Sequence, residues 1–203
     1  PSSQMVSSIG GNASTNAGGP HCLKYGITVN HVLGLEVVTG AGEILSVGGK
    51  AHDHPGYDLA GALVGGEGTL GLLTEITVRL LHEPAGVRTL LASFSAIDDA
   101  SEAVSAIVAA GIIPAALEMI DETFVRAINE GVGAGYPKGA GAVLLIELDG
   151  PAAEIEAQAG RIVQICRDHA ALEIRVAQDE AERALLWKGR KEAAGVVGRM
   201  SPA

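Results

Sequence analysis

The sequence predicts an α+β protein whose second part folds as a ferredoxin-like antiparallel layer. Before Pro84, short β-rich runs are punctuated by glycine. After Pro84, strand patterns of about six residues alternate with helical patterns of two turns or more, with antiparallel returns. This change of character places a domain boundary near residues 83–86, so we expect one part over residues 1–84 and another over 85–203.

In the first part we expect a hairpin, a short helix and a further strand. Runs 32–39 and 43–47 are rich in β-formers and are joined by Gly-Ala-Gly. Asp58 has the position of an N-cap for a short helix through Leu63. Residues 72–80 then alternate between apolar and polar side chains, as a strand does.

In the second part, helical and extended patterns alternate from Val87 to the end. Asp98 or Asp99 is expected to cap the first helix, whose buried face includes Val108, and Gly111 to end it. The predicted strands cover residues 87–94, 115–120, 143–148 and 172–176, and the predicted helices 98–108, 121–128, 151–166 and 179–198.

Composition restricts the class of protein. A chain of 203 residues, 47% of them hydrophobic, can bury a substantial core. A net charge of −10 without a run of Lys or Arg argues against nucleic-acid binding. Cys22 and Cys166 lie in unlike contexts and do not form a disulfide framework, which favours a reducing, cytoplasmic setting. No run of about 18 apolar residues predicts a membrane span. Because the chain starts at Pro1 without Met and ends just after a helical pattern, we expect a fragment.

The stretch from Gly10 to Gly19 (GGNASTNAGG) is the strongest local signal. It consists of bare backbone and short polar side chains, and such segments can surround an anion with N–H donors. A flexible surface loop has the same composition. Apolar Ile9 before it, and the large side chains of HCLKY after it, favour the binding interpretation.

Residues 66–71 spell G-x-G-x-x-G, the spacing of a dinucleotide-binding fingerprint. That fingerprint requires a strand before it and a helix after it. Here a helical pattern precedes and a strand pattern follows, so the Rossmann interpretation is rejected.

Other candidate residues leave two interpretations open. His52 and His54 flank Asp53 and could chelate zinc, but a third ligand is not apparent, and we expect no metal site. His21 beside Cys22 could approach a ligand or simply pack. Cys166 lies at core spacing on its helix. Positions 187–191 (WKGRK) form either a solvated basic helix face or a carboxylate-binding group.

Three motifs in fixed order resemble a known family: SIGGNASTNAGGPHCLKYG, VLGLEVVTGAGEIL and LVGGEGTLGLLTEITVRLL. They look like the second half of the flavin-binding domain in the vanillyl-alcohol-oxidase-like superfamily, in the branch of the glycolate oxidase flavoprotein subunit and D-lactate dehydrogenases. The later LLWKGRKEA and GRMSPA are similar to the substrate domain of that branch. The family's N-terminal phosphate loop and its histidine-rich metal and catalytic motif are not in this sequence.

The resemblance implies FAD as the cofactor, held by both glycine-rich segments. Leu73 and Ile76 would lie near its adenine end. The implied cofactor-binding residues are Ser8, Gly10, Gly11, Asn12, Ser14, Thr15, Gly18, Gly68, Thr69, Gly71, Leu73 and Ile76.

The resemblance further implies oxidation of a small D-2-hydroxy acid to the 2-keto acid by hydride transfer to FAD. Electrons would pass to a separate acceptor or to partner subunits, with peripheral attachment to the inner membrane through partners as an option. Arg190 is the predicted anchor of the substrate carboxylate, since a guanidinium offers a planar two-point grip. We expect the isolated chain to be inactive and to bind FAD poorly. The alternative is a non-catalytic module that binds an anion or nucleotide.

Overall fold

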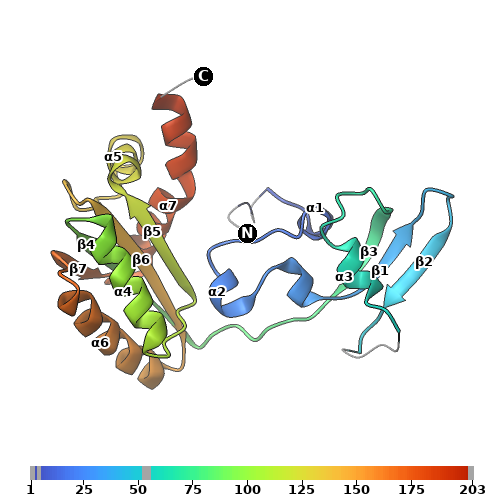
Figure 1. Ribbon diagram of the computed structural model, residues 1–203, viewed down its shortest axis with the longest axis horizontal. Coiled ribbons are helices and arrows are strands. Elements are labelled where there is room, and N and C mark those ends of the chain that lie inside the picture. The colour runs from blue at the N-terminus through green and yellow to red at the C-terminus, as the bar shows by residue number, and fades with distance from the viewer. Residues whose placement is uncertain (1–2, 4–5, 52–55, 201–203) are drawn as a thin grey trace. The chain divides into compact units, whose positions relative to one another are not determined.

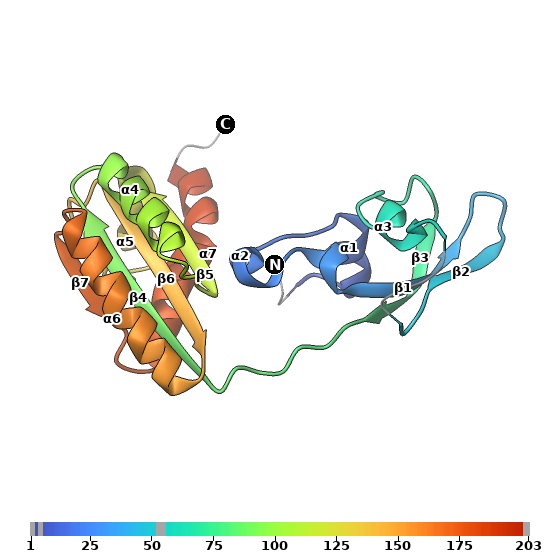
Figure 2. The same ribbon diagram turned by 60° about the horizontal axis from the view of Figure 1, so that its bottom comes forward.

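In the computed structural model, residues 3, 6–51 and 56–200 are described. The chain forms two compact units, Pro1–Glu83 and Pro84–Ala203. Each unit has its own sheet (Figures 1 and 2).

The first unit is built around a three-stranded antiparallel sheet in the order β2-β1-β3. The hairpin of β1 (Val32–Val38) and β2 (Ile44–Gly48) and the strand β3 (Leu72–Val78) confirm the three predicted strands. The short helices are α1 (Ile9–Ser14), α2 (Cys22–Tyr25), a 3-10 turn (Thr28–His31) and α3 (Leu59–Leu63). As predicted, Asp58 caps α3 by accepting a hydrogen bond from the N–H of Gly61.

One face of this sheet is packed and the other is open. Leu35 and Val37 of β1 are buried together with Val64, which directly follows α3. On the opposite face, Ile44 and Leu72, the partners of Val38 on the two neighbouring strands, are each about two-thirds exposed.

The second unit confirms the ferredoxin-like prediction. Its four strands are β4 (Gly86–Phe94), β5 (Ala116–Asp121), β6 (Ala142–Gly150) and β7 (Glu173–Val176), in the antiparallel order β5-β6-β4-β7. Its helices are α4 (Ile97–Ala109), α5 (Glu122–Gly131), α6 (Ala152–Asp168) and α7 (Glu180–Met200). Alternating side chains of the strands build two cores, one under α4 and α6 and one under α5 and α7 (Figure 1).

Two local predictions in this unit were wrong. The N-cap of α4 is Ala96, and Asp98 and Asp99 lie in the first turn, where their charges complement the helix dipole without capping it. Val108 is 49% exposed because the buried stripe of α4 runs through Ala100, Ala103 and Ile107. The predicted helix start at Asp121 is confirmed, since Asp121 is the N-cap of α5, and so is the core position of Cys166.

Close helix packing in this unit depends on glycine. A Cβ atom at Gly189 of α7 would lie 2.9 Å from the Ala134 Cβ and the Ile128 Cγ2 atoms, and one at Gly131 would lie 2.6 Å from a Val196 methyl carbon. The two glycines therefore let α7 approach α5 and the loop that follows it.

Candidate functional site

The first glycine-rich segment folds as the short helix α1 and the turn after it. The Ser8 hydroxyl accepts a hydrogen bond from the N–H of Gly11 at 3.0 Å, which makes Ser8 the N-cap. The Thr15 hydroxyl donates to the Gly11 carbonyl at 2.9 Å. Both hydroxyls thus shape the segment, and each keeps lone pairs for a further partner.

The second glycine-rich segment lies directly against the first. The N–H of Gly65 donates to the Ala13 carbonyl, and that of Glu67 to the Ser14 carbonyl, each at 2.9 Å. The turn is closed by Thr69, whose N–H and hydroxyl both donate to the Gly66 carbonyl. The structure therefore brings together two segments that are some fifty residues apart in the sequence.

Space and donors in these segments fit a bulky anionic cofactor. A Cβ atom at Gly10 or Gly68 would meet no atom of another described residue within 4 Å, its chain neighbours aside. Within the described residues, the N–H groups of Gly10, Gly18 and Gly68 have no hydrogen-bond acceptor. Bare backbone with unused donors beside open space is what close approach of a diphosphate requires. The residues present therefore fit FAD.

Not every predicted glycine serves such an approach. A Cβ at Gly71 would lie 2.5 Å from the Val37 Cγ1 atom, so this glycine is explained by packing against β1. Those at Gly11 and Gly18 would be 3.2 Å from the Ser8 Oγ and 3.3 Å from the Cys22 Sγ. Leu73 and Ile76 pack, partly buried, against the core of the first unit.

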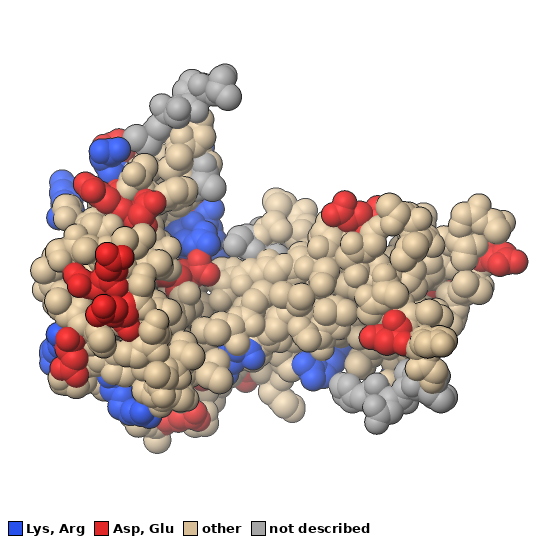
Figure 3. Space-filling model, in the orientation of Figure 1, with Lys and Arg blue, Asp and Glu red and all other residues tan. Residues whose placement is uncertain are grey.

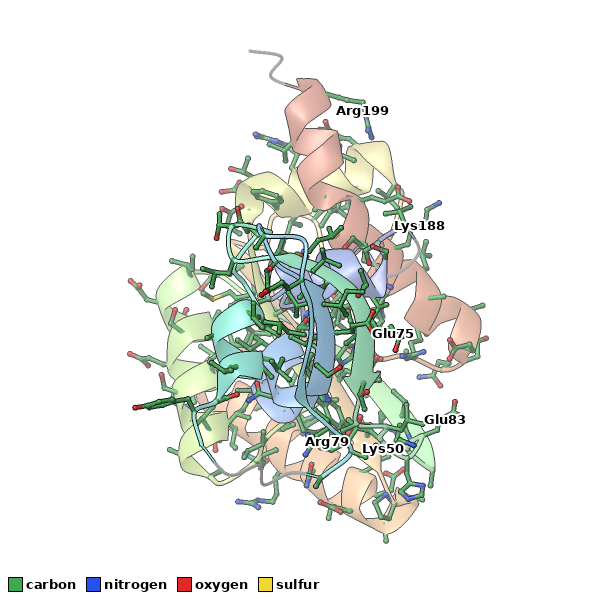
Figure 4. The ribbon with its side chains drawn as sticks, turned by 90° about the vertical axis from the view of Figure 1, so that its right-hand side faces the viewer. Lys50, Glu75, Arg79, Glu83, Lys188 and Arg199 are labelled. Atoms are coloured by element: carbon green, nitrogen blue, oxygen red, sulfur yellow. The ribbon has the colours of Figure 1, made fainter. Side chains whose placement is uncertain are left out.

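The first unit contains few cationic side chains. Residues 1–83 contain three Lys or Arg side chains, and the part of the surface in Figure 3 that belongs to the first unit is mostly uncharged. Two of them, Lys50 and Arg79, follow β2 and β3 at the sheet end where Gly34 pairs with Gly48 and Val32 with Val78 (Figure 4). The Gly66–Gly71 turn enters β3 at the opposite end. Recognition of a phosphate at the Gly66–Gly71 turn would therefore depend on backbone N–H groups and hydroxyls rather than on Lys50 or Arg79.

A hollow of about 180 Å³ adjoins the first segment. Its lining includes Gly18, His21, Cys22, Tyr25 and His31. The Cys22 sulfur accepts the N–H of Gly19 at 3.0 Å, and a His31 ring nitrogen contacts the Tyr25 carbonyl at 2.8 Å. His21 and Cys22 therefore border open space beside Gly18. His52 and His54, the possible zinc ligands, lie outside the described residues.

In the second unit, α7 carries a stripe of polar side chains toward the sheet. Arg183, Trp187 and Arg190 are spaced four and three residues apart and so share one face of the helix. They meet two glutamates on the same sheet face, Glu147 of β6 and Glu118 of β5.

Glu147 is a buried carboxylate with four donors. Its side chain is 3% exposed and accepts bonds from the Thr89 hydroxyl (2.8 Å), the Trp187 Nε1 (2.6 Å) and two nitrogens of Arg183 (2.9 and 3.2 Å). The hydrogen bonds to Glu147 raise the pKa of Arg183 above its ordinary value. Because each of these four donors has an acceptor on the Glu147 carboxylate, the network fixes the N-terminal half of α7 on the sheet.

Arg190 faces Glu118. Its Nε and Nη2 atoms lie 2.6 and 2.5 Å from the Glu118 Oε2 atom, with the two side chains 34% and 18% exposed. Close by, burial raises the pKa of the Tyr136 hydroxyl, an effect that the charges of Arg190 and Arg175 oppose. Lys188 and Lys191 are exposed, and Figure 4 shows Lys188 extending away from the helix. The solvated-face interpretation therefore describes these two lysines, whereas Trp187 is buried and Arg190 is paired.

Sequence reasoning missed Glu118, Glu147 and Arg183. Each glutamate interrupts an apolar strand pattern, in ALEMI and in VLLIELDG, and such a charge needs a partner when buried. That signal was available. The identity of the partners was not, because Arg190 and Glu118 are 72 residues apart.

The fold is that of a flavin-linked oxidase. The model of the family described as "FAD linked oxidases, C-terminal domain" matches residues 83–203, and that of "FAD binding domain" matches residues 1–48. The chain belongs to the FAD-linked oxidases, which confirms the resemblance to the vanillyl-alcohol-oxidase-like family.

Relatives support the same branch. The chain is 50% identical over its whole length to glycolate oxidase subunit GlcD of Escherichia coli (strain K12) and 45% identical to that of Bacillus subtilis (strain 168), covering 40% and 43% of those proteins. It is 33% identical to a probable mitochondrial D-lactate dehydrogenase of Danio rerio, over 92% of this chain and 38% of that protein. The chain thus spans about two-fifths of the length of these relatives.

A solved structure shares the fold. An alkyldihydroxyacetonephosphate synthase superposes with a TM-score of 0.75, at 19% identity, over 98% of this chain and 38% of the other.

None of the helices among the described residues is long and apolar enough to cross a membrane.

Proposed function

We propose that this chain is part of an FAD-dependent oxidoreductase that oxidises a small D-2-hydroxy acid, of the glycolate or D-lactate type, to the 2-keto acid. The observation that carries the proposal is the 50% identity to a glycolate oxidase subunit across both units of the chain. Both free cysteines agree with a reducing, cytoplasmic location. Electrons would leave for a separate acceptor or partner subunits, as the word "subunit" in the relatives' names suggests. Peripheral attachment to the inner membrane would then come through those partners.

In this proposal the first unit holds the cofactor. The residues involved are the predicted set: Ser8, Gly10, Gly11, Asn12, Ser14, Thr15, Gly18, Gly68, Thr69, Gly71, Leu73 and Ile76. Backbone N–H groups of Gly10, Gly18 and Gly68 would donate to the diphosphate, at about 1.5–3 kcal/mol for each charge-assisted bond. The chemistry that FAD supplies when bound is the acceptance of a hydride.

In the second unit Arg190 binds the carboxylate of the hydroxy acid. It is the one side chain of the WKGRK segment whose charged group is both held in place and partly open to solvent. A guanidinium grips a carboxylate at two points and so fixes the orientation of the carbon next to it. Lysine keeps the charge and loses this fork.

The test uses the full-length flavoprotein that carries this chain. Glycolate or D-lactate, added without oxygen, should bleach the visible flavin absorbance, and L-lactate should not. Arg190→Lys should keep its flavin and lose about 2 kcal/mol or more of transition-state stabilisation in kcat/KM. A flavoprotein that no 2-hydroxy acid reduces would refute the proposed activity. Kinetics of Arg190→Lys within twofold of the parent would refute only the anchor.

A further inference from the structure

The carboxylate that holds Arg190 lies in an unusual position. Ala116, Glu118 and Ile120 alternate along β5 and share the face covered by α5 and α7. Ala116 and Ile120 belong to the buried core, so Glu118 is a charged residue in an otherwise apolar row. A carboxylate is costly at such a place unless a partner compensates it, and Arg190 is that partner.

The geometry of the pair uses only one edge of the guanidinium. Both bonds run from the Nε and Nη2 atoms to a single oxygen of Glu118. Across the described part of the chain, no acceptor meets the Nη1 atom, and about a third of the side chain is exposed. A guanidinium has five N–H donors in a rigid fork, so the edge formed by Nη1 and Nη2 stays able to take a second carboxylate.

The two glutamates under α7 differ in what they leave open. Glu147 uses both oxygens on four donors and is almost fully buried, which fits a residue that fixes the helix. Glu118 uses one oxygen and remains 18% exposed. Its bonds go to the side chain proposed to bind substrate.

Glu118 has two opposite effects on the affinity of Arg190 for a substrate carboxylate. Its negative charge weakens the pull of Arg190 on an anion, whereas its bonds hold a long, flexible side chain in one geometry before substrate arrives. At a partly exposed site water and salt screen the first effect. Preorganisation is not screened, so it should dominate.

We propose that Glu118 is the positioning residue of Arg190: it fixes the guanidinium by the Nε–Nη2 edge and so presents the Nη1 edge to the carboxylate of the 2-hydroxy acid. The proposal rests on the proposed function, in which Arg190 is the carboxylate anchor. Glu118 does not touch the substrate in this arrangement and acts through Arg190.

A double-mutant cycle tests it in the full-length flavoprotein. Glu118→Ala should raise KM for glycolate by about tenfold and change kcat much less, since binding before the chemical step is lost. Glu118→Gln, which keeps one carbonyl acceptor, should give a smaller rise in KM. In an Arg190→Lys background, Glu118→Ala should cause little further change, because residues that act as one unit are not additive. Glu156→Ala, which removes the exposed partner of Arg88, is the matched control and should behave as the parent does.

The outcomes distinguish this inference from the function it rests on. If Arg190→Lys is strongly impaired while Glu118→Ala resembles the parent, lowers KM, or adds fully to Arg190→Lys, the positioning role is overturned and the anchor stands. Should Arg190→Lys itself match the parent, the anchor fails and the positioning role with it. A second readout is the thermal shift produced by oxalate, which has two carboxylates and no α-hydrogen. Glu118→Ala should reduce that shift, and an unchanged shift counts against the proposal. If Glu118→Ala does not fold, Glu118→Gln carries the same comparisons.

Discussion

Removing the carboxylate of Glu147 should destabilise the second unit strongly. In Glu147→Ala the Thr89 hydroxyl and the Trp187 Nε1 lose their acceptor, and both residues are at most 6% exposed. Each buried donor left unpaired costs about 1–3 kcal/mol. Arg183 adds less, because its side chain is 28% exposed and water can solvate it. The free energy of unfolding should therefore fall by about 3–5 kcal/mol, the range measured when one partner of a buried ion pair is removed.

Trp187 is a built-in reporter for this experiment. It is the only tryptophan of the 203 residues, and its indole N–H belongs to the network. Denaturant unfolding followed by its fluorescence thus reports on the second unit, with circular dichroism as an independent measure. The control is Glu156→Ala, whose ion pair with Arg88 is exposed and should contribute less than about 1 kcal/mol. A loss below about 1 kcal/mol in Glu147→Ala, or one equal to the control, would refute the reasoning.

Four further predictions follow from glycines, a cysteine and the chain as a whole. Gly10→Ala should stabilise helix α1 by about 0.5–1 kcal/mol yet lower the flavin content of the full-length protein, and Gly68→Val should lower it too; a normal flavin-to-protein ratio contradicts the cofactor role. Gly189→Ala should cost about 1–3 kcal/mol by forcing α7 from its neighbours, whereas Gly160→Ala, in open space on α6, should raise the melting temperature; equal effects would be evidence against close packing. Burial raises the pKa of Cys166 from 9 to about 11, so the unfolded state ionises first and stability falls between pH 9 and 11; Cys166→Ala should lack this part of the pH dependence, and identical pH profiles of the two proteins speak against it. The isolated chain should bind FAD weakly, and calorimetry that detects sub-micromolar binding would disprove that.

The elements could be predicted from the sequence because their signals are local. The hairpin depends on two β-rich runs and a Gly-Ala-Gly turn, and α5 on an aspartate that caps its first turn. The same local reasoning chose the wrong cap for α4, because aspartates suit the first turn of a helix as well as its cap. Patterns of this kind identify the type of an element more surely than its end.

The sites could be predicted only where one segment carries the signal. The glycine-rich segments can be recognised from their composition. Their contact through Gly65 and Glu67, however, depends on the fold. Arg190 was proposed from the pattern of its own helix alone. The orientation of its guanidinium depends on Glu118, which comes from a strand in another part of the sequence.

The two glutamates show which sequence feature carries information about such partners. A charge inside an apolar strand conflicts with its surroundings, and the conflict persists in a folded protein only where another element resolves it. Both glutamates are paired by the same face of α7: Arg183 binds Glu147, and Arg190, seven positions further along the helix, binds Glu118. Helix α7 therefore cannot slide or rotate on the sheet without unpairing both carboxylates. This makes the orientation of Arg190 a property of the whole second unit. Under the proposed role of Arg190 as the carboxylate anchor, a substitution at Glu147 should therefore also weaken carboxylate binding.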